Sequence, residues 1–198
     1  GSRHLDAMTA VLRLATSGNR LAAARAEAIA AELRAAHPGL DPRLEIVRPP
    51  GGSGEGRAIA ETGRDAVSLV RDAVLTNAAD VAVHAFDDLP IGAVEGLVLG
   101  AVPMRADPRD VLVAGDGKAF QFQPPGVRIG TASARCAAQL LRRRSDIAIV
   151  PQQGDVAARL AALDHGEVDA VVLVAADLDR LGLLYRITQW FDTDLMIP

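Results

Sequence analysis

The sequence is poor in lysine, cysteine and aromatic residues, and the first two shortages limit the chemistry that the chain can carry. Lys118 is the only lysine, so arginine carries nearly all of the positive charge, and Schiff-base chemistry has a single candidate. That lysine lies in a Gly-Asp-Gly turn, where we expect an exposed side chain. The one cysteine, Cys136, cannot form an internal disulfide, so nothing in the sequence indicates an oxidising compartment.

Long apolar runs and an excess of positive charge are missing as well. No run of about 18 apolar residues occurs, and no basic segment followed by an apolar one opens the chain. The net charge is −4, which gives no basic field for nucleic acid or acidic lipid. We therefore expect a soluble, cytoplasmic protein that binds neither nucleic acid nor a membrane. Residues 1–7 resemble the remnant of an expression tag before Met8, and they are left out of the fold prediction.

The chain is rich in Ala, Val and Leu, arranged as alternating strand and helix patterns. Its apolar fraction of 49% over 198 residues suffices for one large domain or two small ones. The hydrophobic periods predict helices at residues 19–36, 65–77, 133–143, 155–163 and 176–181. They predict strands at residues 11–16, 44–47, 81–83, 96–102, 111–114, 147–150, 170–174 and 184–191, and a strand end at 126–130 that leads into a helix. Residues 49–56, rich in glycine and proline, predict an irregular loop.

The break at residues 103–110 predicts a hinge between two α/β lobes, residues 8–103 and 108–198. Each lobe would consist of a mixed sheet flanked by helices. A ligand site is then expected in the cleft between the lobes.

The stretch Ala79–Pro90 is the strongest candidate for a functional segment. Its apolar run Val81–Val83 predicts a buried strand of a parallel sheet, whose carboxyl end delivers His84, Asp87 and Asp88 into a crevice. Adjacent residues of an extended chain point in opposite directions, so only one of the two aspartates is expected to face that crevice. We predict that this aspartate is a functional carboxylate, and that His84 is a core histidine with a satisfied hydrogen bond.

Three strand-to-helix junctions have the composition of anion sites: 16–19, 130–135 and 153–155. At the second junction, Thr131, Ser133 and Arg135 could bind one carboxylate or phosphate together. The alternative, given equal weight, is that Ser133 only caps the helix. Arg159 and Arg180 could add further contacts, although a lone helical arginine is usually a solvated surface residue.

Cys136, one turn into the same helix, has two alternatives. The helix dipole could lower the pKa of its thiol, or the residue is a small buried side chain, which we favour.

Taken together, these segments resemble the porphobilinogen deaminase (hydroxymethylbilane synthase) family over residues 12–198. The resemblance rests on Leu14-Ala15-Thr16 with Leu21-Ala22, Ala79–His84 with Asp88-Leu89-Pro90, Arg105–Asp110, Gly130–Arg135, Arg159-Leu160 and Arg180–Leu183. It implies two lobes like those of type II periplasmic binding proteins, together with a small third domain. It further implies a dipyrromethane cofactor and the stepwise condensation of porphobilinogen with loss of ammonia.

The resemblance also implies roles for individual residues. Asp88 would hydrogen-bond the pyrrole nitrogens and handle protons as the catalytic residue. Hydroxyl groups and arginines of the second lobe would bind acetate and propionate groups, namely Thr131, Ser133, Arg135, Arg159 and Arg180. Five further residues complete the predicted substrate site: Thr16, Ser17, Asn19, Asp87 and Gln153.

The sequence departs from the family pattern mainly by losing cations. Six family residues are replaced: arginines by Ser17, Cys136 and Gln153, lysines by Asp87 and Asp179, and a serine by Ala85. The segment corresponding to the lysine-rich cofactor loop, residues 55–64, contains no lysine, and the sequence stops before a cofactor-attachment domain. Each lost cation removes a contact worth about 1.5–3 kcal/mol. These departures predict that no dipyrromethane cofactor is bound and that the chain is not a tetrapyrrole synthase.

Two functions from different classes remain. The first is an enzyme retooled for a small pyrrole or amine-bearing carboxylic acid, in specialised metabolism, with Asp88 as the acid/base group and Thr131, Ser133 and Arg135 on one carboxylate. The second is a non-catalytic protein that keeps the fold and binds a small carboxylate-bearing ligand or a partner enzyme. A third alternative is that the sequence simply stops short of a third domain.

Overall fold

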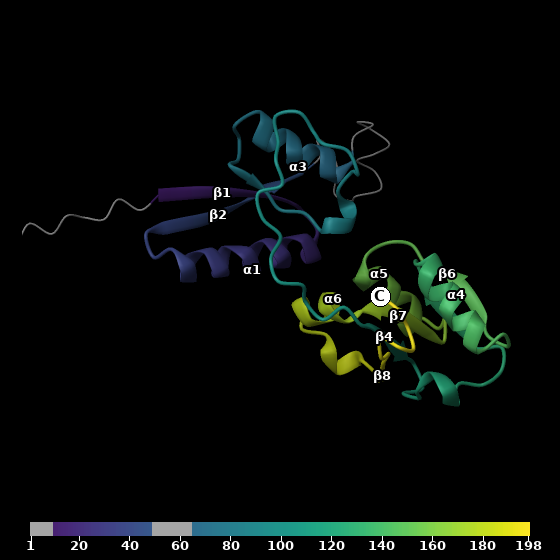
Figure 1. The fold of residues 1–198 in the computed structure, drawn as a ribbon. Helices are drawn as coiled ribbons and strands as arrows, with labels where there is room; N and C mark the ends of the chain where they lie inside the picture. Colours follow the sequence, from purple (N-terminus) through teal and green to yellow (C-terminus); the bar gives the residue numbers. More distant parts are fainter. Residues whose placement is uncertain (1–9, 49–64) are drawn as a thin grey trace, which may run out of the picture. The chain divides into compact units, whose positions relative to one another are not determined.

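The computed structural model describes residues 10–48 and 65–198 and divides the chain into two compact units, residues 1–102 and 103–198 (Figure 1). The predicted loop at residues 49–56 and the segment at 55–64 that corresponds to the cofactor loop lie outside the described residues. Because each unit is described by itself, the predicted site in a cleft between two lobes stays a prediction.

The first unit is built on a three-stranded parallel sheet in the order β2-β1-β3. Its strands are β1 (Ala10–Ser17), β2 (Leu40–Val47) and β3 (Val81–Ala82). The central strand carries the core, because Leu14 and Ala15 are fully buried. Leu14 pairs with Leu44 on one side and with Val81 on the other.

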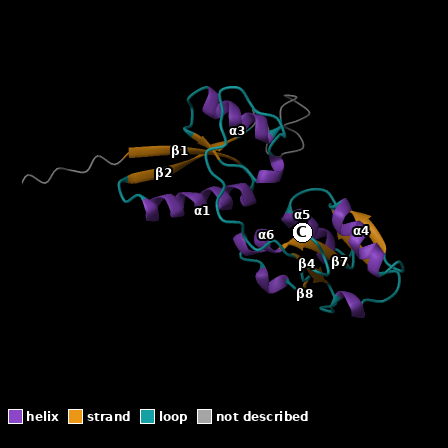
Figure 2. Cartoon of the chain, in the orientation of Figure 1, coloured by secondary structure: helices purple, strands orange, loops and turns teal. Residues whose placement is uncertain are grey.

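Among the described residues, two helices lie in the connections between these parallel strands, since parallel pairing requires crossover connections. They are α1 (Arg20–Ala36) and α3 (Ala66–Leu75) (Figure 2). Each begins one residue after a side chain that accepts a backbone hydrogen bond: Asn19 from the Ala22 N–H, and Asp65 from the Ser68 N–H. Both helix starts confirm the prediction, since such caps are read from local sequence.

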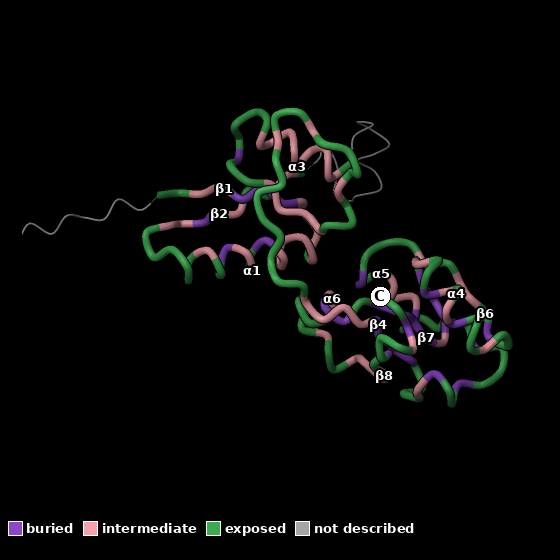
Figure 3. The backbone as a smooth tube through the Cα atoms, in the orientation of Figure 1, coloured by how far each residue is buried: buried purple, intermediate pink, exposed green. Residues whose placement is uncertain are grey.

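Two strand predictions in this unit are wrong. β3 pairs in parallel as expected, but it comprises only two residues at the edge of the sheet, and Val81 is 40% exposed instead of buried. Residues 96–102 form no strand despite their apolar sequence. No strand of the described chain pairs with them, and Val98 and Leu99 are exposed, as the tube view shows for most of this segment (Figure 3). An apolar run without a partner strand lacks the hydrogen bonds that define a strand.

The second unit contains a five-stranded mixed sheet in the order β6-β5-β7-β4-β8. Its strands are β4 (Asp110–Ala114), β5 (Arg128–Thr131), β6 (Ala148–Pro151), β7 (Ala170–Val174) and β8 (Gln189–Trp190). β5 runs parallel to β6 and β7, whereas β4 runs antiparallel to β7 and β8. The predicted strand at 184–191 is correct only for Gln189–Trp190, because Leu184–Arg186 forms a 3₁₀ turn.

Three helices flank this sheet: α4 (Ala134–Arg143), α5 (Val156–Asp164) and α6 (Ala175–Arg180). Neighbouring residues of β4 belong to two different core clusters. Leu112 packs in a cluster with Leu140 of α4, and Val111 in a cluster with Leu160 of α5. Since successive strand residues point to opposite faces, both faces of the sheet are covered. These observations confirm the predicted α/β class with sheets flanked by helices; the described strands form a mixed sheet in the second unit and a parallel sheet in the first.

The two units share one detail of construction. In the first unit, the Arg13 guanidinium contacts Asp80 at 2.7 Å and donates to the Asn77 carbonyl. In the second unit, Arg128 contacts Asp169 at the same distance and donates to the Gly166 carbonyl. Each arginine lies on a strand of its unit, and each aspartate directly precedes the strand that pairs with the arginine's strand. In both units, an arginine of one strand is therefore joined by an ion pair and hydrogen bonds to the loop before the paired strand.

Candidate functional site

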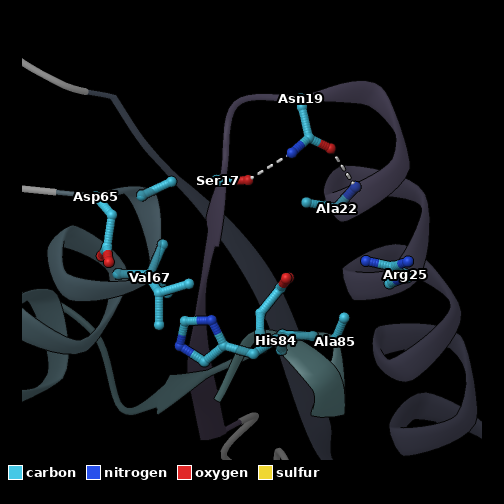
Figure 4. Close-up of a pocket in the computed structure, with 12 residues that line it drawn as sticks. Ser17, Asn19, Ala22, Arg25, Asp65, Val67, His84 and Ala85 are labelled. Carbon is cyan, nitrogen blue, oxygen red and sulfur yellow. Dashed lines mark hydrogen bonds between the residues drawn. The ribbon is translucent and has the colours of Figure 1, made fainter. Parts of the chain in front are cut away.

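A cavity of about 320 Å³ lies within the first unit (Figure 4). It is bounded by the end of β1, the N-termini of α1 and α3, and the segment that follows β3. Its polar lining residues are Ser17, Asn19, Arg25, Asp65, His84 and Asp88. This volume falls at the lower end of the range of about 300–1,000 Å³ in which proteins bind small molecules.

The α1 side of the cavity presents hydrogen-bond donors and a positive charge. Asn19 caps the helix by accepting the Ala22 N–H at 2.7 Å, and its Nδ2 donates to Ser17 Oγ at 3.0 Å. Arg25, one turn further along α1, is half-buried and also lines the cavity. The first turn of α1 contains no acidic residue, so the positive end of the helix dipole is not neutralised there.

The α3 side carries a carboxylate and a histidine. Asp65 accepts the Ser68 N–H, and hydrogen bonds from Ser68 lower the pKa of the Asp65 carboxyl. Burial lowers the pKa of His84, and attraction from Asp88 opposes that shift without reversing it. His84 Nε2 is buried and has no hydrogen-bond partner among the described residues. The prediction of a satisfied core histidine is therefore wrong, because this side chain keeps one unused hydrogen-bonding group.

Asp88 lines the cavity from a 3₁₀ turn, Phe86–Asp88, and its N–H donates to the Ala85 carbonyl at 3.2 Å. Asp87 is exposed and does not line the cavity. The argument from an extended chain is wrong at this position, since a 3₁₀ turn separates adjacent side chains by about a third of a turn. Only one of the two aspartates is nevertheless placed at the cavity.

Of the three predicted ligand residues at the end of β1, two line the cavity and one does not. Ser17 and Asn19 contribute to its wall, whereas Thr16 is fully buried in the strand. The Thr16 hydroxyl has no hydrogen-bond partner among the described residues. Its place in a substrate site is therefore not supported by its position.

In the second unit, the predicted anion-binding residues contact other parts of the protein. Thr131 Oγ1 accepts the Ser133 N–H at 3.1 Å, and Ser133 Oγ accepts the Cys136 N–H at 3.3 Å. Arg135 Nη2 lies 2.8 Å from Asp110 Oδ2, and Arg135 Nη1 donates to the Ile197 carbonyl. The contacts of Ser133 are those of a helix cap, which was the alternative. A shared anion site at this junction stays a prediction.

The remaining predicted cations are also held by neighbouring backbone. Arg159 Nε donates to the Gly154 carbonyl at 3.0 Å, and Arg180 Nη1 donates to the Ala176 carbonyl at 3.3 Å. Gln153 is exposed. Cys136 is 2% exposed, and burial raises the pKa of its thiol, so the alternative of an activated thiolate is wrong. Lys118 is exposed beside Asp116, as expected for a turn.

Comparison with known proteins decides the family. The family model described as "Porphobilinogen deaminase, dipyromethane cofactor binding domain" matches residues 12–198. The chain belongs to the porphobilinogen deaminase family. The cavity with Asp88 therefore lies in a member of an enzyme family.

Two relatives show how much of a porphobilinogen deaminase this chain represents. The porphobilinogen deaminase of Syntrophobacter fumaroxidans is 38% identical over 190 residues, which cover 95% of this chain and 62% of that protein. That of Leifsonia xyli is 42% identical over 187 residues, which cover 93% of this chain and 56% of that protein. The chain thus spans about six tenths of the length of these relatives.

Solved structures give a weaker likeness. A periplasmic sulfonate-binding protein of Methylobacillus flagellatus covers 96% of this chain and 59% of its own, with 17% sequence identity and a TM-score of 0.46. A likeness of this size has no bearing on the ligand of the deaminase-family chain. Among the described residues, no helix has both the length and the apolar character needed to cross a bilayer.

The expectation that no dipyrromethane is bound is wrong. The family model that matches this chain is that of the dipyrromethane cofactor-binding domain. Losing several cations changes individual contacts, but it does not remove the rest of a binding domain. The identity of the chain therefore points to a dipyrromethane cofactor.

The cavity fits one ring of such a cofactor. A dipyrromethane contains two linked pyrrole rings with carboxylate side chains. Asp88 offers a carboxylate that accepts from a pyrrole N–H, and Arg25 offers a guanidinium for a carboxylate. The unpartnered Nε2 of buried His84 is a further polar atom that a ligand could satisfy. Asp88, Arg25 and His84 are thus the residues of this unit that would hold one pyrrole ring at a time, either a ring of the group or the ring that reacts with it.

Sequence reasoning missed Arg25 and Asp65 as cavity residues. Asn19 predicts the start of α1, and Arg25 follows it by six positions in the second turn. The sequence does not indicate that this second turn lies beside a cavity. Asp65 was recognised only as the start of a helix. At the cavity, these helix starts lie close together although they are about 40 residues apart in sequence. A local sequence pattern does not show which distant segments meet in space.

Proposed function

We propose that this chain acts in an enzyme of the porphobilinogen deaminase type, on a single carboxylate-bearing aminomethylpyrrole. The observation that carries the proposal is the position of Asp88 on the wall of a cavity of about 320 Å³ that also holds Arg25 and His84. A carboxylate, a guanidinium and an uncharged imidazole together match the pyrrole N–H, carboxylate and amine of such a molecule.

Asp88 is assigned the role of stabilising charge on the pyrrole. When ammonia leaves an aminomethylpyrrole with the bonding electron pair, the positive charge left behind spreads over the ring to its N–H. A carboxylate within hydrogen-bonding reach of that N–H lowers the energy of this state more than that of the neutral ring.

Dipyrromethane, when bound, would supply the pyrrole carbon to which the substrate's methylene group becomes joined. The residues of the cavity have separate tasks. Asp88 orients a ring through its N–H, and Arg25 fixes a carboxylate side chain. Burial lowers the pKa of His84, which favours the uncharged imidazole, and this imidazole can accept a hydrogen bond from the ammonium group that leaves as ammonia.

A small substrate is favoured over a long polypyrrole by size and by charge. The cavity volume suits one substituted ring. Asp87 is exposed beside Asp88 and carries a negative charge where the family resemblance places a lysine. Each added pyrrole unit brings further carboxylates, which this charge repels. Growth of a long product is therefore disfavoured.

The second candidate is a protein that binds a pyrrole carboxylate without turnover. It is favoured by the second unit, where Arg135, Arg159 and Arg180 all have hydrogen-bond partners within the protein. Side chains that are already engaged are less available to hold a reacting chain. Tight binding of porphobilinogen without ammonia release would select this candidate.

Ammonia release from porphobilinogen is the test. We expect the wild-type protein to release ammonia, and Asp88→Asn to slow the release by about 100-fold or more, since the neutral amide keeps the shape but loses the charge. Asp87→Asn is the matched control: it removes the same charge one residue away and outside the cavity, and it should not reduce the rate. Equal losses in both variants, or no release by the wild-type protein, would refute the proposed catalytic role.

A further inference from the structure

Arg25 lines the cavity, and neither the sequence nor the family resemblance gave it a role. We infer that Arg25 is the carboxylate-recognising residue of this site and sets its preference for acidic pyrroles. The inference rests on the proposed function, because it assigns one ligand group to one wall of the same cavity. It concerns a binding contact and can therefore be tested without turnover.

The charge distribution of the lining supports this assignment. Among the described residues that line the cavity, Arg25 is the only one with a positive charge. The other ionisable groups are the carboxylates of Asp65 and Asp88 and the imidazole of His84, whose pKa burial lowers. Among the charged side chains of the described lining, both aspartates would repel a ligand carboxylate and Arg25 would attract it.

The location of Arg25 adds to this preference. Its side chain extends from α1, across the cavity from Val67 of α3 and from Asp65, which caps α3 (Figure 4). The nearby first turn of α1 has backbone N–H groups and no acidic side chain, so the helix dipole favours a negative charge on the same side. The lining of the cavity thus carries a positive charge on α1, at Arg25, and negative charges at Asp65 and Asp88.

This polarity fixes how a ligand with both charges would lie. Its carboxylate would face Arg25, and its ammonium would face Asp88 and the uncharged His84. The guanidinium is suited to the task because its planar fork can donate two parallel hydrogen bonds to one carboxylate.

Arg25 also explains how the chain tolerates the absence of an arginine at the end of its first strand. Ser17 occupies that position and lines the same cavity, where its Oγ accepts a hydrogen bond from Asn19. A serine hydroxyl alone cannot balance the charge of a carboxylate. The cation needed for it is supplied instead from the neighbouring helix.

The first test uses the wild-type chain and a pair of small probes. Pyrrole-2-carboxylate and pyrrole-2-carboxamide have nearly the same shape and differ by one negative charge. Isothermal calorimetry should show the carboxylate binding at least about tenfold more tightly, the factor expected for a charge-assisted hydrogen bond over a neutral one. Equal affinities, or tighter binding of the amide, would overturn the inference.

The second test uses a matched pair of variants on one helix. Arg25→Gln should weaken binding of pyrrole-2-carboxylate by about 10- to 100-fold and leave binding of the carboxamide unchanged. Arg20→Gln removes the same charge from an exposed residue of α1 that does not line the cavity, so it should change neither affinity. Equal effects of the two variants would show that only the general charge of the helix matters, and this would refute the role of Arg25.

Two further measurements separate folding and catalysis from binding. Circular dichroism checks that Arg25→Gln folds, and Arg25→Lys, which keeps the charge but loses the fork, should recover part of the affinity. Asp88-dependent ammonia release without any carboxylate preference would refute the inference alone. If neither probe binds and porphobilinogen releases no ammonia, the inference and the proposed function both fail.

Discussion

Replacement of Arg135 by alanine tests whether this side chain holds the second unit together. Arg135 Nη2 lies 2.8 Å from Oδ2 of Asp110, and Asp110 is only 3% exposed. That oxygen accepts no hydrogen bond among the described residues, so the charge of Arg135 is what offsets its burial. Removing the arginine leaves a buried carboxylate without its counter-charge.

The expected cost follows from the exposure of the two partners. Breaking a fully buried pair costs about 3–5 kcal/mol, and breaking a surface pair costs less than about 1 kcal/mol. The side chain of Arg135 is 39% exposed, so water can partly replace it, and we expect an intermediate loss of about 2 kcal/mol. With an m-value of about 1–3 kcal/mol/M, the urea midpoint should fall by about 1 M.

Tryptophan fluorescence during urea unfolding is the appropriate assay, because Trp190 is the only tryptophan and lies in the second unit. The matched control is Arg142→Ala, an exposed position on the same helix, which should shift the midpoint by less than about 0.3 M. The double variant Asp110→Asn, Arg135→Ala should recover part of the loss, because no buried charge remains. Identical midpoints for Arg135→Ala and Arg142→Ala would refute the reasoning.

Two further predictions concern stability. The hydrogen bonds of Arg13 lower the pKa of Asp80 to about 2, below its unfolded value of 3.8, so the stability that Asp80 contributes is present above about pH 4 and is lost as the pH falls toward 2. Asp80→Asn should therefore flatten the fall of the urea midpoint between these pH values, and an unchanged acid dependence would contradict it. Leu112→Ala should lower the free energy of unfolding by about 2–5 kcal/mol, because Leu112 is fully buried in the core of the second unit. Leu99→Ala should hardly change it, because Leu99 is exposed. Chemical unfolding of both variants measures this difference, and similar costs would mean that the assigned core is wrong.

The candidate site could be predicted from the sequence only in part. Asp88, Ser17 and Asn19 were predicted and do line the cavity, because each stands in a motif or a cap that is local in sequence. Arg25 was not predicted, since an arginine in the second turn of an Ala-rich helix has no local feature that separates it from a solvated one. Thr16 belongs to the same motif as Ser17, but the alternation of the strand turns it into the core.

The sequence by itself determined where the helices begin and which family the chain belongs to. Asn19, Asp65, Ser133 and Asp155 each cap the helix predicted to follow them. A cap depends on a side chain and a backbone N–H three residues apart, so the information is local. The motif around Asp88 likewise identified the deaminase family without any knowledge of distances.

The tertiary structure decided every feature that needs a distant partner. Residues 96–102 have the composition of a strand but pair with no strand of the described chain, and β3 lies at a sheet edge with Val81 exposed. Arg135 has the motif of an anion-binding residue, yet this α4 side chain lies against Asp110, which precedes it by 25 residues and begins strand β4. A paired strand, an ion pair or a cavity wall forms only when the fold brings two segments together that are distant in sequence. The sequence of one segment does not specify which other segment it will meet.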